Sequence, residues 1–155
     1  MDASEIRGLL SQIQRLTPQL DDATAAAVQA VRRIETFLEK CAIGLHFRLV
    51  VMENGENGAV HLLYQRTHEK PRIAVRVQNM PALGLRDNTL VHWTDCPRDI
   101  KMLTFPFIPE LLKVIVEGLT AEVGKTASAT QLAESMMAAV EAGPVDLRRA
   151  SAAPR

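Results

Sequence analysis

Apolar residues in the first part of the chain recur at the spacing of an α-helix. The first group has this spacing over its whole length and consists of Ile6, Leu9, Leu10, Ile13 and Leu16. It is followed by Thr17-Pro18, a dipeptide that suits the start of a helix because threonine caps it and proline fits its first turn. The pattern therefore predicts a break or kink at this point and an N-terminal helical hairpin.

The second predicted helix carries the clearest periodicity of the chain. Its apolar positions are spaced alternately by four and three residues, at Leu20, Thr24, Ala27, Val31, Ile34, Leu38, Cys41 and Leu45. Such a heptad seam is typical of a coiled coil. Small or weakly apolar side chains occupy Thr24, Ala27 and Cys41, and Val28 and Phe37 broaden the apolar face. These features favour packing against the domain's own core, with a helix–helix dimer as the alternative.

The period then changes to that of β-strands. Residues 46–52, 59–66 and 72–78 are rich in alternating apolar and polar residues, and turn-forming residues such as those of 54–58 separate them. Short connections between adjacent strands predict an antiparallel meander of three strands. Residues 90–94 can add a fourth.

The C-terminal third returns to helical patterns. Residues 99–105 fit either a short helix or an edge strand, and the helix is favoured. A nearly all-apolar helix follows over 109–123, for which Gly124 predicts the end, and Ser128 predicts the start of a last helix. Residues 144–155 have little to bury and are expected to form a disordered tail.

Composition fits one domain built on an aliphatic core. The chain has 155 residues, of which 47% are hydrophobic and only 4% aromatic. The predicted fold class is α+β: an N-terminal helical hairpin, a three- or four-stranded antiparallel meander, and C-terminal helices packed on the sheet, all within residues 1–143. The formal net charge is zero, so no global field attracts nucleic acid or a membrane. Without a secretory signal pattern near its start, the chain is expected to be cytoplasmic.

Motifs that suggest an enzyme are weak. Gly124-Lys125-Thr126 resembles the end of a phosphate-binding loop, but Leu119 stands where that loop needs its first glycine. Cys96 and His92 could pair as nucleophile and base, but no third orienting group can be named. Histidines and cysteines also lack metal-ligand spacing. The sequence therefore predicts no catalytic residue, metal or cofactor.

The two faces of the predicted sheet differ in character. One is continuously apolar and consists of Phe47, Leu49, Val51, Val60, Leu62, Tyr64, Ile73, Val75 and Val77. The other face mixes apolar residues with Arg48, His61, Gln65, Arg72 and Arg76. This basic face predicts a binding surface for an acidic protein partner or an anion. Nucleic acid is disfavoured, because the aromatic side chains of the strands fall on the covered face.

Taken together, these patterns favour a non-enzymatic protein-interaction or adaptor module that self-associates as a homodimer. The alternative is anion or nucleic-acid binding through the basic sheet face. A third interpretation is a cysteine-dependent enzyme built on Cys96. Salt-dependent oligonucleotide binding would support the alternative, and thiol labelling well below pH 8 would support the third.

Overall fold

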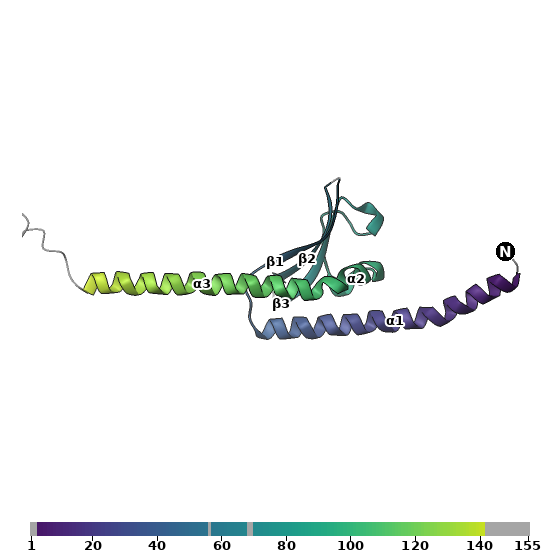
Figure 1. The fold of residues 1–155 in the computed structure, drawn as a ribbon, viewed down its shortest axis with the longest axis horizontal. Coiled ribbons are helices and arrows are strands. Elements are labelled where there is room, and N and C mark those ends of the chain that lie inside the picture. Colours follow the sequence, from purple (N-terminus) through teal and green to yellow (C-terminus); the bar gives the residue numbers. More distant parts are fainter. Residues whose placement is uncertain (1–2, 56, 68–69, 142–155) are drawn as a thin grey trace, which may run out of the picture. The chain divides into compact units, whose positions relative to one another are not determined.

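The computed structural model describes residues 3–55, 57–67 and 70–141 of the chain. Its elements are α1 (Ala3–Lys40), β1 (Phe47–Asn54), β2 (Gly58–Thr67), β3 (Lys70–Gln78), β4 (Leu90–His92), α2 (Arg98–Thr104) and α3 (Ile108–Glu141), with 3₁₀ turns η1 (Pro81–Leu83), η2 (Trp93–Asp95) and η3 (Phe105–Phe107) (Figure 1). This order confirms the α+β class and the four-stranded form of the antiparallel meander. The expected tail, 144–155, lies outside the described residues.

The N-terminal region is one helix of 38 residues, so the predicted hairpin is wrong. Thr17 does not cap a second helix, because its hydroxyl donates a hydrogen bond of 2.9 Å to the Ile13 carbonyl one turn earlier. Pro18 removes one backbone donor, but the Gln14 carbonyl that would have accepted it lies on an exposed helix surface that water can reach. The helix therefore continues, and it bends in its N-terminal part (Figure 1).

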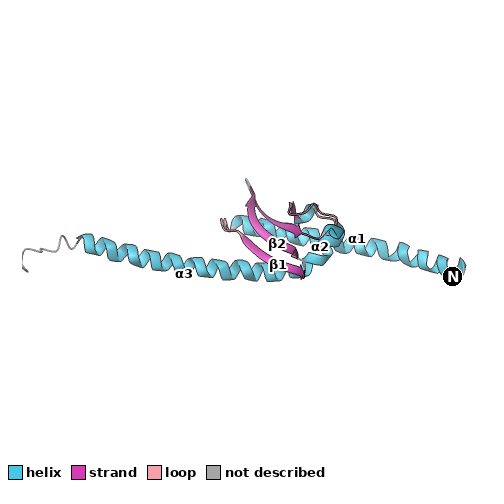
Figure 2. Ribbon diagram, turned by 90° about the horizontal axis from the view of Figure 1, so that it is seen from above, coloured by secondary structure: helices cyan, strands magenta, loops and turns pink. Residues whose placement is uncertain are grey.

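Only the C-terminal half of α1 packs against the sheet. Ala27, Val31 and Leu38 are at most 5% exposed, and this part of the helix contacts β3. The N-terminal part of α1 extends beyond the strands (Figure 2). Leu20 and Cys41, which occupy the same heptad seam, are exposed. Packing of the seam against the domain's own core is thus confirmed for the middle of the seam and not for its ends.

The strands pair in the order β1-β2-β3-β4, and every neighbouring pair is antiparallel. Tyr64 lies opposite both Phe47 and Ile73, and these three residues share one face of the sheet. Eight of the nine predicted apolar residues share it, namely Phe47, Leu49, Val60, Leu62, Tyr64, Ile73, Val75 and Val77. Those on β2 and β3 are almost completely buried, which confirms the apolar face at the centre of the sheet.

A β-bulge in β1 changes the faces on which Val51 and Met52 lie. The register shifts between Val50 and Met52, so that Val51 has no partner in the ladder and Met52 lies opposite Val60. One extra residue in a strand reverses the alternation of side chains beyond it. Met52, which strict alternation from Arg48 would place on the basic face, therefore lies on the apolar face.

The segment after β4 closes one end of the core around a tryptophan. Trp93 is fully buried, its indole N–H donates to the Thr104 hydroxyl at 2.8 Å, and its ring packs against Phe105. Thr104 in turn donates to the Ile100 carbonyl at 2.7 Å. These contacts join η2 to α2, and the helical interpretation of residues 99–105 is confirmed.

The last helix, α3, is also longer than predicted. Gly124 does not end it and Ser128 does not start another, because the Ser128 hydroxyl donates to the Gly124 carbonyl inside one continuous helix. A glycine in a helix interior costs only about 1 kcal/mol relative to alanine, too little to stop a long helix. Burial is limited to its start, where Leu111 and Ile115 are buried and Val116 is already 62% exposed.

The described residues divide into two units that meet between Ile115 and Val116. Within them, the buried apolar side chains run from Ala27 to Ile115, so the first unit contains the hydrophobic core. The second unit is the rest of α3, where side chains are exposed or half-buried. A single domain over residues 1–143 stays a prediction.

Candidate interaction surfaces

The N-terminal half of α1 presents a row of large apolar side chains to solvent. This α1 stripe consists of Ile6, Leu9, Leu10, Ile13, Leu16 and Leu20, which are 43–58% exposed. At 100° per residue, they fall within about 120° of the helix surface. Isolated exposed leucines are ordinary in proteins, but a contiguous apolar row of this length is a candidate interaction surface.

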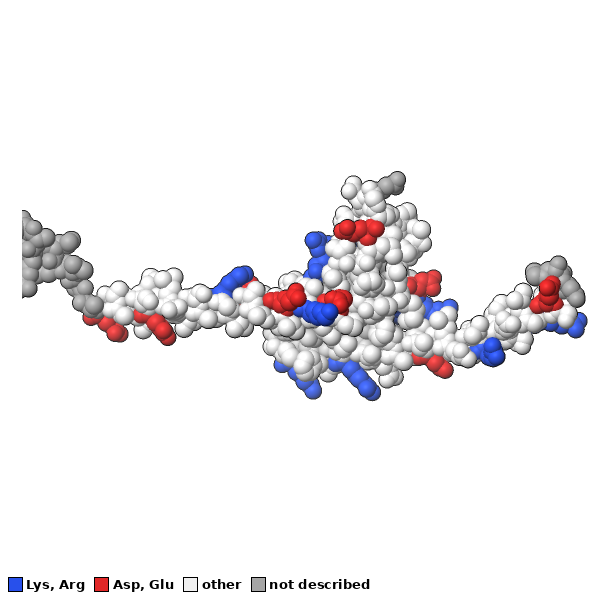
Figure 3. Space-filling view, viewed as in Figure 1, with Lys and Arg blue, Asp and Glu red and all other residues white. Residues whose placement is uncertain are grey.

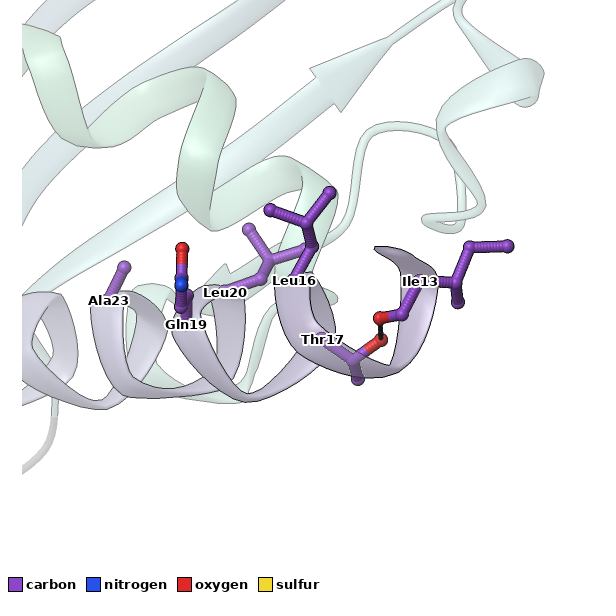
Figure 4. A pocket seen from close by; sticks show the side chains of 6 residues that line it. All are labelled: Ile13, Leu16, Thr17, Gln19, Leu20 and Ala23. Carbon is purple, nitrogen blue, oxygen red and sulfur yellow. Dashed lines mark hydrogen bonds between the residues drawn. The ribbon is translucent and has the colours of Figure 1, made fainter. Parts of the chain in front are cut away.

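A shallow groove of about 450 Å³ lies along the C-terminal part of the α1 stripe. It is lined by Ile13, Leu16, Thr17, Gln19, Leu20 and Ala23. Figure 4 shows Leu16 and Leu20 projecting to the same side of the helix, while the Thr17 hydroxyl is turned back to the Ile13 carbonyl. The groove is therefore apolar, and its rim consists of uncharged polar groups.

The α1 stripe continues the face by which the same helix packs on the sheet. Leu20 is followed at helical spacing by Ala27 and Val31, both buried. At the transition, Asp21 forms an ion pair of 2.8 Å with Arg98 at the start of α2. The apolar face of α1 thus extends beyond the part of the first unit that covers it.

A second exposed apolar surface lies on the C-terminal part of α3. Its large residues are 63–80% exposed and comprise Val123, Leu132, Met136, Met137 and Val140. Figure 3 shows long uncharged stretches between the charged side chains of both long helices. The α3 surface is less regular than the α1 stripe, because alanine, serine and threonine fill most intervening positions.

The face of the sheet opposite the apolar one, here called the outer face, holds all five residues predicted as a binding site. Strand register places His61 opposite Arg76 and Gln65 opposite Arg72, and Arg48 lies on the same face opposite Leu63. His61 and Gln65 are four positions apart on β2, a span of roughly 13 Å. The predicted set therefore forms two groups rather than one cluster.

Arg72 belongs to a contact within the fold. Its guanidinium donates to the Glu35 carboxylate at 3.2 Å, and the other carboxylate oxygen accepts the Ile73 backbone N–H at 2.8 Å. Glu35 is 5% exposed. It joins α1 to β3 where β4 no longer pairs, since β4 covers only Ala74 to Arg76. Sequence reasoning missed Glu35, although an acid inside an apolar seam is a usable signal.

His61 is the most unusual polar residue of the outer face. It is 5% exposed, and neither ring nitrogen makes a hydrogen bond of ordinary geometry. Burial lowers the pKa of His61 below its ordinary value, and the charges of Arg48 and Arg76 lower it further. The nearby Gln78 side chain and Glu53 act in the opposite direction and are outweighed. His61 is therefore a neutral, buried donor beside two cations.

The cysteine interpretation receives no support from the geometry. Cys96 is 3% exposed, and burial raises the pKa of its thiol to about 11. The thiol approaches the His92 backbone carbonyl rather than an imidazole nitrogen. A thiolate is disfavoured in this setting.

The Gly124-Lys125-Thr126 segment also lacks the geometry of a phosphate-binding loop. Gly124 lies within helix α3, so the backbone forms no loop that could surround a phosphate. Lys125 pairs with Glu122 at 2.6 Å, and the Thr126 hydroxyl donates to the backbone carbonyl of the same Glu122. The motif is thus an ordinary exposed segment of helix.

No group of three or more potential ligands among the His, Cys, Asp and Glu side chains of the described residues is placed to hold a metal ion. Across the same residues, no helix combines the length and apolar character required to cross a membrane.

Comparison with known proteins gives no further guide: no protein-family model, no curated protein and no solved structure matches the chain.

Proposed function

We propose that this protein is a non-enzymatic interaction module that self-associates, with two copies pairing along their α1 stripes. The observation that carries the proposal is the exposure of six large apolar side chains on one face of α1, between Ile6 and Leu20. The same helix face is buried further along, from Ala27. A second helix laid on the stripe would extend that burial over the whole length of α1.

The energetics of the α1 stripe favour a partner that supplies an equal apolar surface. Six side chains that are about half exposed gain roughly 5–9 kcal/mol when fully covered. Association costs roughly 4–15 kcal/mol in lost translational and rotational freedom. One stripe against a polar surface is therefore marginal, whereas two stripes that bury each other double the gain.

The charge pattern around the α1 stripe is compatible with a second copy. The positions beside the stripe carry the uncharged residues Gln12, Thr17 and Gln19 along most of its length, and Glu5 stands beside its N-terminal end. Between Gln12 and Gln19, two copies side by side in parallel thus bring no like charges together at these flanking positions, where charged residues ordinarily select or reject partners. A partner with a charged flank would find no complementary charge there.

Light scattering after gel filtration tests the proposal. The expected mass is twice the 17.1 kDa of one chain. Replacing two stripe residues, Ile13→Glu with Leu16→Glu, should give a monomer with an unchanged fold, because both side chains are half exposed in the single chain. The matched control is Gly8→Glu with Ser11→Glu on the opposite side of the helix, where a side chain at Gly8 meets no neighbouring atom.

A different outcome would place the interface on α3 instead of α1. If Leu132→Glu with Met136→Glu on α3 abolishes the dimer and the α1 variant does not, pairing through α1 is wrong. A full-length chain that remains a monomer at high micromolar concentration would reject self-association altogether. Ile6→Cys, in a background with Cys41→Ser, gives the orientation, since a disulfide between copies forms only when the helices run parallel.

A further inference from the structure

The outer face of the sheet contains a group of polar nitrogens that the fold does not satisfy. Two adjacent rows run across the strands, one through His61 and Arg76, and the next through Arg48 and His92. Ala74 lies between Leu63 and His92 in the second row, and Ala74 and Leu63 are themselves buried. The unsatisfied nitrogens come from β2, β3 and β4, and Arg48 adds a positive charge from β1.

Several of these nitrogens are buried and lack an acceptor. Both ring nitrogens of His61, Nε of Arg76 and Nδ1 of His92 have no hydrogen-bond partner of ordinary geometry, although water scarcely reaches them. The side chains of Gln78 and Glu53 lie near the His61 ring without satisfying it in this way. Leaving a buried polar group unpaired costs about 1–3 kcal/mol. Folded proteins rarely carry several such groups side by side without a ligand or an ordered water that satisfies them.

The missing partner is an acceptor and not a donor. Within the part of the chain that the structure describes, neither Arg48 nor Arg76 has a carboxylate within 4.0 Å. Arg72 differs in this respect, because it forms an ion pair with Glu35. A metal ion is disfavoured beside two guanidinium groups, since cations repel each other at this range.

We propose that the outer face binds an oxyanion, the phosphate or carboxylate group of a small ligand, between His61 and Arg76. The His61 ring N–H and Arg76 Nε donate to its oxygens, and Arg48 supplies a second positive charge from β1. His92 borders the site from β4. Sequence reasoning named His92 only as a partner for Cys96; its pairing with Ala74 places it here instead.

This oxyanion site is distinct from the α1 stripe. Its residues lie on strands, so substitutions there leave the proposed dimer unchanged. The site is also no platform for single-stranded nucleic acid, which needs exposed aromatic rings. Phe47 and Tyr64 pack against each other on the opposite face, and Trp93 is buried beside α2.

Titration of the full-length protein with inorganic phosphate, and separately with succinate, tests the proposal. Saturable shifts of the His61 ring signals in nuclear magnetic resonance spectra are expected, and the tighter of the two anions identifies the ligand chemistry. Arg76→Ala should weaken binding at least tenfold, with a smaller loss at high salt. Arg66→Ala on the same pair of strands is the control, because Arg66 lies opposite Pro71 on the other face and should have no effect.

Two further variants separate binding from folding. Arg76→Lys keeps the charge but removes the Nε donor, and it should also weaken binding. His61→Leu should abolish binding while the protein melts at the same or a higher temperature, because an unsatisfied buried group is lost. If neither anion gives saturable shifts up to 50 mM, or if Arg66→Ala matches Arg76→Ala, the oxyanion site does not exist. A crystal grown in phosphate that shows only water on His61 would be equally decisive against it.

Discussion

His61 makes the stability of the protein depend on pH in a definite direction. Burial and two neighbouring arginines lower its pKa in the folded state, below the ordinary value of 6.5 that applies to the unfolded chain. As pH falls through 6.5, the unfolded state therefore takes up a proton that the folded state resists. The free energy of unfolding should decrease from pH 7.5 to 5.5, and this contribution stops changing below the folded pKa.

Urea denaturation at these two pH values measures the effect. His61→Leu should lose less stability than the natural chain over the same interval, because it has no proton to take up. His46→Leu, at an exposed histidine just before β1, is the control and should behave like the natural chain. Equal losses in all three proteins would show that His61 does not resist protonation.

The two cysteines should differ sharply in reactivity. Cys41 is exposed at the end of α1, whereas Cys96 is buried and its pKa is raised to about 11. At pH 7.5 a thiol reagent should label Cys41 within minutes and leave Cys96 unmodified until the protein is unfolded in urea. Mass spectrometry of the labelled peptides distinguishes the two. Fast labelling of Cys96 in the folded protein would revive the interpretation as a nucleophile.

The junction between α1 and β3 rests on one carboxylate. Glu35→Ala should lower the free energy of unfolding by about 2–3 kcal/mol, because the buried Ile73 N–H loses its acceptor. The ion pair adds little to this figure, since the Arg72 side chain is 41% exposed and can be rehydrated. Glu35→Gln keeps an oxygen for Ile73 and should cost about 1 kcal/mol.

A matched control for Glu35 lies one turn further along the same helix. Glu39 is exposed and faces Lys70 at 3.9 Å, so Glu39→Gln should change stability by less than about 0.5 kcal/mol. Urea denaturation compares the three variants. Similar small effects at both positions would mean that α1 is held to the sheet by its apolar contacts alone.

The strands were predictable and the helix ends were not, for physical reasons that differ. Alternation along β2 and β3 fixes which side chains share a face, because a slip of one residue would expose Leu62 or Val75. The bulge at Val51 left no such mark, since Val50, Val51 and Met52 are all apolar and fit either face. Pro18 failed as a stop signal, because it removes one hydrogen bond from a helix whose neighbouring turns remain intact.

The candidate surfaces show a similar division. The pattern indicated that Arg48, His61 and Arg76 share a face, and the strand register confirms this. It could not indicate that Arg72 pairs with Glu35, because that contact joins residues 37 positions apart in different elements. Periodicity likewise cannot distinguish an apolar helix face that is covered from one that is exposed, so the helical spacing of the α1 stripe did not indicate its exposure.

The chain as a whole combines one buried core with two long helical segments that contribute little to it. The buried apolar side chains of the described residues lie between Ala27 and Ile115. Residues before Asp21 and after Gly124 are exposed throughout the described part of the chain. In a single copy these segments gain almost nothing from packing, whereas most helices in proteins are stabilised by the packing of an apolar face. The proposed association would therefore stabilise them.

A shortened chain from Asp21 to Gly124 separates the core from association. It keeps every buried apolar residue and the Asp21–Arg98 ion pair, so it should fold and unfold cooperatively as a monomer. The melting temperature of the full-length chain should rise with protein concentration, because a dimer stabilises the folded state by mass action. The melting temperature of the shortened chain should not depend on concentration. The melting temperatures of the two chains should converge at low concentration. A shortened chain that fails to fold would show that the exposed helices support the core. If the melting temperature of the full-length chain does not depend on concentration, self-association through α1 is wrong.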